Sequence, residues 1–310
     1  MARPKRRKVA RTSRPRLPFV TLASALAALG LIIYGCVAIN HQIKGYFGGG
    51  ASKSHEISGG QSPTPQATSL SEASQPPAIA SPTPTPSGAS PAPRVAIIID
   101  DCGYSEERCK RFLQLPIPIT LSILPMTPYG KQIEADALAA GKFVMLHLPM
   151  EPQSALANPG VGAITTQMTD DQVQAQVEAD VDSLNNVPGV NNHEGSKATS
   201  DPRVMRDVLN VLQKRHMFFI DSLTSGSTVG ASTARELGIP TAERDIFLDN
   251  QKDIVYIRGQ VKQVEDVARK RGSAIAIGHP NASTAQALAE AIPQMQADGI
   301  IFVPAESLVK

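Results

Sequence analysis

Asp100 and Asp101 are adjacent carboxylates that directly follow the apolar run Val95–Ile99 and lie just before Gly103. Two like charges side by side resist joint ionisation, so the pair requires a cation or must share a proton. The apolar run is short, rich in Ile and bounded by Pro93 and Gly103, which favours a buried strand over a helix. The stretch predicts a strand that delivers two carboxylates to a site, although an ordinary turn with solvated carboxylates would explain it equally well.

Other residues with chemically useful side chains occupy the same kind of position, where an apolar strand-like run ends. They are His147, His193, Asp221, Asp249 and His279. Each one alone could cap a helix, but a shared position for all of them is hard to explain by coincidence. The other histidines do not follow this pattern: His41, His55 and His216.

Three of these side chains have the composition of a catalytic zinc site. One carboxylate and two imidazoles leave a position on the ion open for water, which the ion acidifies. We therefore predict that Asp101, His147 and His193 bind a divalent metal, with Zn²⁺ as the expected ion. Asp100 would lie beside the metal as general base, and His279 would protonate a leaving amine.

A further group of residues is predicted to support the reacting side chains or to contact substrate. The candidates are Asp221, Arg244, Asp249, Glu151 and Asn192. Asp221 and Asp249 each end a strand-like run, so they would orient the imidazoles or Arg244.

The elements that must position these residues alternate along residues 94–310. Strand-like runs occur at Val95–Asp100, Ile119–Leu124, Phe143–Leu148, Val190–Asn192, Met217–Asp221, Ile246–Asp249, Ala274–Gly278 and Ile300–Pro304. Helices are expected after the caps Ser105 and Thr169, from Asp201–Pro202, and at Val261–Lys270 and Ser283–Gln296. The alternation predicts a parallel α/β fold. Seven or eight strand–helix units favour a distorted (β/α) barrel over an open sheet.

A barrel would explain why the candidate residues are so widely spaced in the sequence. In (β/α) barrels the carboxyl ends of the strands converge on one face, and that face carries catalysis. Side chains between Asp100 and His279 would then meet in one mouth.

The first 93 residues have a different composition. Residues 1–16 contain Lys and Arg without an acidic residue, and residues 17–39 are uncharged and long enough to span a bilayer. The basic residues place the N-terminus in the cytoplasm, so we expect a single-pass anchor in a bacterial inner membrane, with the catalytic domain in the periplasm. A cleaved signal peptide and a basic nucleic-acid tail are the alternatives. The net charge of +2 gives no support for nucleic-acid binding.

Residues 40–93 are rich in Pro, Ser and Gly and have few large apolar side chains. Such a segment cannot bury enough surface to offset its ordering entropy, so we expect a disordered linker before a folded domain at 94–310. Within that domain, Cys102 and Cys109 could form a disulfide in an oxidising compartment.

Five short motifs of the expected domain carry a family resemblance. They are Ile97–Gly103, His147–Pro152, Gly189–Ser196, Phe219–Ser222 and Ile277–Pro280. Together they resemble the divergent polysaccharide deacetylase family, over nearly all of residues 94–310. The resemblance implies a distorted (β/α) barrel, a divalent metal that is usually zinc, and removal of N-acetyl groups from glycans. It also implies Asp100 as base, Asp101 as ligand and His279 as acid.

One position departs from the pattern of the mainstream deacetylases. Those enzymes place two ligand histidines four residues apart, whereas the residue four positions after His147 is Glu151. The second imidazole would therefore come from His193. The chain also lacks Trp, which is unusual for an enzyme that stacks sugar rings.

The sequence as a whole predicts a metal-dependent hydrolase that removes N-acyl groups from an amino-sugar glycan of the cell envelope, such as peptidoglycan. Glu151 and the absence of Trp motivate an alternative, a catalytically inactive binding or scaffolding module on the same fold. Hydrolysis of a phosphoester or a peptide is a third possibility. A serine hydrolase is disfavoured because no Gly-x-Ser-x-Gly elbow occurs.

Overall fold

A computed structural model describes residues 91–310 of the chain. The predicted basic tail, the predicted membrane span and residues 40–90 of the predicted linker lie outside the described residues. Within residues 91–310, no helix is both long and apolar enough to cross a membrane.

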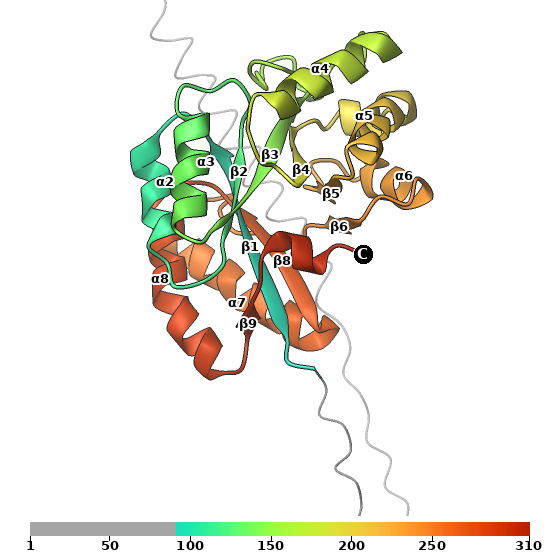
Figure 1. The fold of residues 1–310 in the computed structure, drawn as a ribbon. Helices are drawn as coiled ribbons and strands as arrows, with labels where there is room; N and C mark the ends of the chain where they lie inside the picture. Colours follow the sequence, from blue (N-terminus) through green and yellow to red (C-terminus); the bar gives the residue numbers. More distant parts are fainter. Residues whose placement is uncertain (1–90) are drawn as a thin grey trace, which may run out of the picture. The chain divides into compact units, whose positions relative to one another are not determined.

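The described part of the chain is organised around one sheet in which all the ladders are parallel (Figure 1). Its strands are β1 Arg94–Cys102, β2 Thr120–Ile123, β3 Phe143–Met150, β4 Gly189–Glu194, β5 Phe218–Asp221, β6 Thr241–Glu243, β7 Ile246–Phe247, β8 Ser273–Gly278 and β9 Ile301–Phe302. Their order is β6-β5-β4-β3-β2-β1-β8-β7, and β9 pairs with the start of β1. The predicted parallel α/β class is confirmed.

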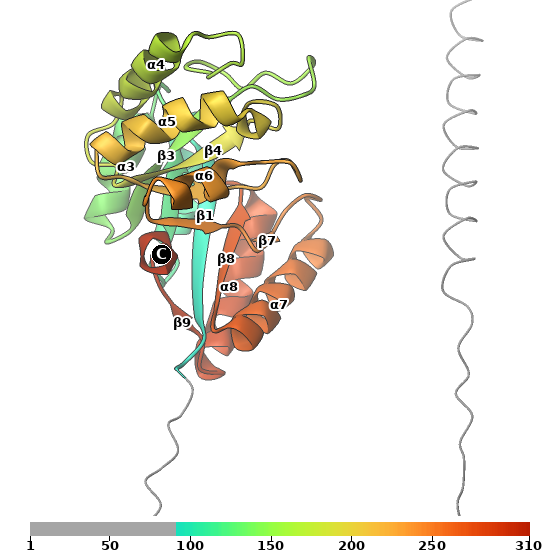
Figure 2. The same cartoon turned by 90° about the vertical axis from the view of Figure 1, so that its right-hand side faces the viewer.

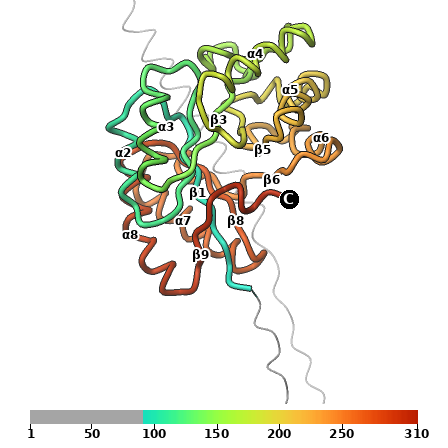
Figure 3. The backbone as a smooth tube through the Cα atoms, in the orientation of Figure 1, coloured from blue at the N-terminus to red at the C-terminus, as the bar shows by residue number. Residues whose placement is uncertain are grey.

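The strands at the two ends of this order, β6 and β7, do not pair with each other, but they are consecutive in the sequence. Strands β6 and β7 are separated by Arg244 and Asp245, whose backbone N–H groups donate to Asp221 on β5 and to Ile275 on β8, at 3.0 and 2.9 Å. The backbone around β6 and β8 can be followed in Figure 3. The sheet is a curled, parallel half-barrel, which is consistent with the distorted (β/α) barrel that we expected.

Helices connect the successive strands, except β6 and β7, and cover the outer face of the sheet. They are α2 Glu106–Leu113, α3 Gly130–Ala139, α4 Asp170–Asp182, α5 Pro202–Lys214, α6 Gly230–Glu236, α7 Ile254–Arg271 and α8 Ala282–Ala297. Figure 2 shows α4 packed with α5, and α7 with α8. The predicted caps are confirmed, because Ser105, Thr169 and Asp201 each accept a hydrogen bond from a backbone N–H of the first turn of α2, α4 and α5 respectively.

Strand alternation divides the core into two layers. On β1, Val95, Ile97 and Ile99 belong to the large cluster shared with the helices. Ala96 and Ile98 face the interior of the half-barrel. The other buried members of this inner layer are Met145, Phe218, Ile220, Ile275, Ile277, Ala305 and Leu308. The last two come from the 3₁₀ turn η2, Ala305–Leu308, which contributes to the apolar floor of the barrel.

Candidate metal centre

The inward-facing columns of the sheet end in polar residues. Asp100 lies two positions after the inner-layer residue Ile98 on β1, and His147 lies two positions after Met145 on β3. In the same way, His279 lies two positions after Ile277, directly after the end of β8. Side chains two positions apart on a strand point to the same face. The apolar floor and the polar mouth are therefore successive layers of one alternating pattern.

Asp101 reaches the same mouth through an irregularity in β1. The register of β1 against β2 shifts between Ile99 and Cys102, and Asp101 has φ 56°. A bulge re-aims a side chain that regular alternation would point toward the helices, and a non-glycine residue in this region of φ is strained. This local strain allows both neighbouring carboxylates to face one site.

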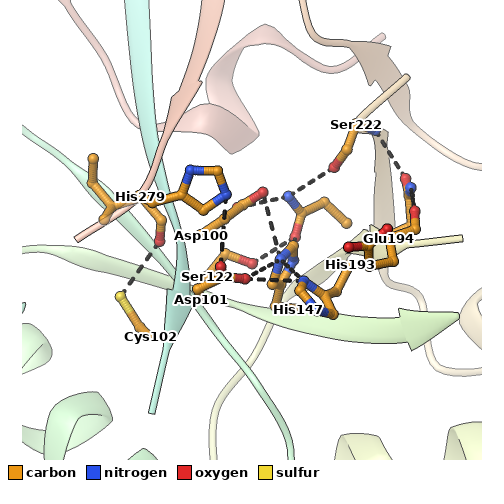
Figure 4. A network of polar contacts seen from close by, with 12 residues as sticks. Asp100, Asp101, Cys102, Ser122, His147, His193, Glu194, Ser222 and His279 are labelled. Atoms are coloured by element: carbon orange, nitrogen blue, oxygen red, sulfur yellow. Dashed lines mark hydrogen bonds and ion pairs between the residues drawn. The ribbon is translucent and has the colours of Figure 1, made fainter. Parts of the chain in front are cut away.

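The side chains of Asp101, His147 and His193 converge on a common point (Figure 4). His147 Nε2 lies 3.1 Å from His193 Nδ1 and 3.3 Å from Asp101 Oδ1, and His193 Nδ1 lies 2.9 Å from the same oxygen. Asp101 Oδ1 is buried and accepts no hydrogen bond from any residue of the described chain. Within the trio the two imidazoles are in hydrogen-bond contact, and Asp101 Oδ1 is left as an electron-pair donor without a hydrogen bond.

A divalent ion fits this set of donors. Zinc binds imidazole nitrogen and carboxylate oxygen at about 2.0–2.2 Å, which places neighbouring tetrahedral ligand atoms roughly 3.3 Å apart. The three separations, from 2.9 to 3.3 Å, lie close to that value. A cation at this point would also satisfy the otherwise unpaired Asp101 Oδ1. The roles of these three residues as ligands remain predictions.

Asn191 fixes the tautomer of His147. Its Nδ2 donates to Asp100 Oδ1 at 2.9 Å and to Ser222 Oγ at 3.1 Å. Because a carboxylate accepts hydrogen bonds, the amide oxygen of Asn191 faces the other way, toward Ser122 Oγ at 2.5 Å and His147 Nδ1 at 2.8 Å. His147 therefore carries its proton on Nδ1, and the lone pair on Nε2 points at the trio.

Asp100 is the most deeply placed carboxylate of the mouth, with 3% of its surface exposed. Burial raises the pKa of Asp100, and the charges of His147 and His279 oppose this effect only in part. Burial would also raise the pKa of Asp101, but the imidazoles of His147 and His193 outweigh burial and hold that pKa well below its usual range. The pKa values of Asp100 and Asp101 are therefore shifted in opposite directions. This difference suits the roles predicted for them, Asp100 as base and Asp101 as ligand.

His279 lies opposite the trio and is held by Asp249. Its Nε2 is 3.7 Å from Asp101 Oδ2, and its Nδ1 is 2.9 Å from Asp249 Oδ1. Thr284 and Asn281 donate to the other oxygen of Asp249. Burial alone would lower the pKa of His279, but the hydrogen bond to Asp249 and the nearby carboxylates raise it to about 9. His279 is therefore protonated at neutral pH and suited to donate a proton.

The remaining predicted residues lie at different distances from the trio. Arg244 and Asn192 line the same pocket as the trio. Asn192 connects β4 to the loop after β5, because it accepts a hydrogen bond from the backbone N–H of Ser222 and donates to Thr224 Oγ1. Glu151 accepts from Lys197 Nζ and from Thr166, both at 2.7 Å, and does not line the pocket.

The orienting role predicted for Asp221 does not match its contacts. Its carboxylate accepts hydrogen bonds from Leu223, Thr228 and Ala231, and no imidazole or guanidinium contacts it in residues 91–310. Asp221 follows Ile220, an inner-layer residue, and therefore points to the opposite face of β5. The inward residue is the next one, Ser222, which contacts Asn191.

Sequence reasoning missed two members of this polar network, Asn191 and Ser222. Both are almost completely buried. The signal that could have found them is the two-residue period of the strands, since Asn191 is two positions before His193, and Ser222 is two positions after Ile220.

The network opens into a pocket with a volume of about 810 Å³. Besides the site residues, its lining includes Tyr104, whose surface is 58% exposed, and the cations Arg108 and Lys252. Nearby, Cys102 and Cys109 are both buried and have free thiols.

The fold and site define a parallel α/β half-barrel with a candidate divalent-metal centre at the carboxyl ends of its strands. The chain belongs to the divergent polysaccharide deacetylase family, whose model matches residues 97–309. The resemblance inferred from the motifs is confirmed.

Two curated relatives are similar over most of the described domain, and both are uncharacterised proteins. The one from Haemophilus influenzae is 35% identical over 205 residues, covering 66% of this chain and 73% of the relative. YibQ of Escherichia coli is 34% identical over 221 residues, covering 70% of this chain and 68% of the relative.

A solved structure shares the fold. The crystal structure of an uncharacterised protein from Agrobacterium tumefaciens has a TM-score of 0.68 and 22% identity, and the match covers 72% of this chain and 92% of that one.

Proposed function

We propose that this protein is a metal-dependent hydrolase that removes N-acyl groups, such as acetyl, from an amino-sugar glycan of the cell envelope. The observation that carries the proposal is the arrangement of the mouth. A three-residue donor set lies beside a buried carboxylate, Asp100, and a protonated imidazole, His279. Membership of the divergent polysaccharide deacetylase family supports a polysaccharide substrate.

Asp101, His147 and His193 would hold the metal, with zinc the ion expected. Such an ion supplies Lewis acidity, which lowers the pKa of water and polarises an acyl carbonyl. The oxygen and two nitrogens leave room in a tetrahedral arrangement for one further group. The open pocket above them admits substrate to that position.

The residues on either side have complementary roles in proton transfer. Asp100 accepts the proton of the attacking water, and its raised pKa makes it a better base than an exposed carboxylate. His279 donates a proton to the amine that leaves the acyl carbon, and Asp249 keeps the imidazole oriented and charged. Asn191 holds Asp100 and His147 in fixed relative positions.

The test is acetate release by the full chain, loaded with zinc, from acetylated chitooligosaccharides and peptidoglycan fragments. We expect turnover by the unmodified chain. We also expect Asp100→Asn to reduce kcat by about 10²–10⁴-fold without loss of bound metal. Absence of turnover on every acylated sugar under metal-replete conditions would reject the hydrolase.

The same variant separates the hydrolase from the inactive binding module. A hydrolase requires Asp100, so Asp100→Asn should reproduce in cells the phenotype of deleting the domain. A variant that preserves the wild-type phenotype, when domain deletion does not, would favour the binding module.

We propose in addition that residues 17–39 anchor the protein in the inner membrane, with residues 94–310 in the periplasm. The proposal is supported by the uncharged length of residues 17–39 and by the basic residues that precede them. Protease added to spheroplasts should digest the domain of an anchored protein. Protection of the domain until the cells are lysed would contradict this topology.

A further inference from the structure

One flank of the pocket carries unpaired positive charge. Arg108 on α2 and Lys252, just before α7, line the pocket. Neither side chain contacts a carboxylate or a hydrogen-bond acceptor within the part of the chain that the structure describes. Most arginines of this part are ion-paired, as are Arg203 with Asp170 at 2.9 Å and Arg258 with Glu290 at 2.7 Å. Unlike these arginines, Arg108 has no ion pair in the described chain, and neither has Lys252.

Arg244 is a third pocket cation without a carboxylate partner among residues 91–310. Its Nε and Nη2 donate to the carbonyls of Ser222 and Leu223 at 2.8 and 3.1 Å. Its guanidinium carbon lies 4.8 Å from the centre of the Phe247 ring. These neutral partners orient the guanidinium without neutralising its charge.

The acidic residues of the pocket form no ion pair with these cations. Asp249 is paired with His279, and Asp100 and Asp101 face the imidazoles. The remaining carboxylate of the lining is Glu194, which forms no ion pair within the described chain. Arg108, Arg244 and Lys252 are therefore left without an ion pair among residues 91–310, and the positive charge belongs to this flank of the pocket and not to its whole lining.

Strand order places this charge on a defined side of the mouth. Strands β1, β8 and β7 are neighbours, and they are followed by Arg108, His279 and Lys252 respectively. The metal-binding candidates His147 and His193 come from β3 and β4, on the other side of β1. A glycan whose leaving nitrogen lies at His279 would therefore be close to the cations.

We propose that the β1-β8-β7 flank binds an anionic group of the glycan, a carboxylate or a phosphate, so that the substrate is an acidic amino-sugar polymer and not a neutral one. This inference rests on the proposed function for the identity of the substrate as a glycan. Arg108 and Lys252 lie at the rim of the pocket. Positive charge there accelerates the association of an anionic ligand, and salt screens this attraction. Arg244 lies deeper, where its planar donor group suits an oxyanion.

The test measures equilibrium binding by calorimetry to the zinc-loaded full chain carrying Asp100→Asn, which should retain the metal but turn over too slowly to interfere. The ligands are acetylated oligosaccharides of equal length. One ligand is a neutral chitooligosaccharide, one carries carboxylates as peptidoglycan glycan strands do, and one carries phosphates. We expect an acidic ligand to bind at least about tenfold more tightly than the neutral one at low salt, and this preference to shrink at high salt. The two acidic ligands show which anion the flank prefers.

Charge variants locate the effect on the flank. Arg108→Gln combined with Lys252→Gln should weaken binding of the acidic ligand by about 5–10-fold and leave the neutral ligand unchanged. Arg108→Lys should retain most of the affinity, and Glu194→Gln should strengthen binding. Lys270→Gln is the matched control, because Lys270 is exposed at the end of α7 and does not line the pocket.

Binding is read without turnover, so failures of the two proposals can be distinguished. Equal affinity for neutral and acidic ligands, no binding of either acidic ligand, or no effect of the double variant would overturn the anionic flank. These results would leave the hydrolase intact if acetate is released. Acid-selective binding without acetate release would reject the hydrolase and support the anionic flank.

Discussion

The Nδ1 atom of His279 lies 2.9 Å from Oδ1 of Asp249, and the backbone N–H of His279 donates to the other carboxylate oxygen at 2.8 Å. Asp249 thus holds both the ring and the main chain of the predicted acid. It also provides negative charge beside the imidazole, which contributes to the raised pKa of His279.

This contact predicts the alkaline limit of activity. Because His279 has a pKa of about 9, it is protonated below that pH, and kcat/KM should fall as the pH rises through about 9. Asp249→Asn removes the negative charge, so the pKa of His279 falls and the alkaline limit should move down by about 1–2 pH units. The measurement is the pH profile of kcat/KM.

Thr284→Val is the control for this profile. Thr284 donates to Asp249 at 2.7 Å, so its loss disturbs the carboxylate without removing the charge. We expect a smaller displacement than for Asp249→Asn. An alkaline limit that stays in place in Asp249→Asn would show that His279 is not the titrating acid.

Asn191 should determine metal affinity although it is not one of the three predicted ligands. Asn191→Ala removes the acceptor that fixes the His147 tautomer, and zinc affinity should fall by about 10–100-fold. The neighbouring variant Asn192→Ala should preserve zinc affinity, because the Asn192 amide contacts the loop after β5. Competition with a chelating dye measures the zinc affinity of both variants. Equal losses in the two variants would refute a specific role for Asn191.

Asp180 should make stability depend on pH. It is fully buried on α4, with Gln176 as its hydrogen-bond donor, and burial raises its pKa to about 7. The unfolded chain has the ordinary value of 3.8, so the folded state binds more protons between these two values. The free energy of unfolding should therefore decrease as the pH rises from 3.8 to about 7 and remain reduced above that pH.

Asp180→Asn removes this titration and keeps an acceptor for Gln176. Denaturant unfolding at pH 8 should show the variant to be more stable by about 1–3 kcal/mol, with a smaller difference at pH 5. A variant less stable than the wild type at pH 8 would contradict the assignment.

Gly103 is required by the turn that follows the two neighbouring carboxylates, Asp100 and Asp101. It has φ 134°, and a Cβ atom there would lie 2.3 Å from Thr127 Oγ1. Gly103→Ala should lower the free energy of unfolding by about 2 kcal/mol or more, because strain and a steric clash add. Gly141 also has a positive φ, but a Cβ atom there would have no neighbour within 4 Å. Gly141→Ala should therefore lower the free energy of unfolding by only about 1 kcal/mol. Denaturant midpoints test the difference, and equal losses would rule out the clash.

The sequence predicted the strands with continuous apolar runs more accurately than the short ones. Val95–Asp100 and Phe143–Leu148 lie within β1 and β3, because buried parallel strands have an unmistakable composition. The three-residue strand β6 was missed, since Thr241–Glu243 has no apolar run. Helix α6 was also missed, because its residues Gly230–Glu236 have no large apolar side chain.

The site was predictable where a residue type and a strand end coincide. That reasoning placed Asp101, His147 and His193 in one mouth, and the structure brings them together. It failed for Asp221, because one position on a strand exchanges the inner face for the outer face. The bulge that turns Asp101 inward depends on pairing with β2, which has no signature in the sequence around Asp101.

The central claim is that Asp101, His147 and His193 bind one ion together. Equilibrium zinc titration of the metal-free full chain tests it most directly, with Asp101→Ala, His147→Ala and His193→Ala as variants and His216→Ala as the control. The account predicts one high-affinity ion per chain, a loss of at least about 100-fold in each ligand variant, and unchanged affinity in the control. Wild-type zinc affinity in any of the three ligand variants would contradict it.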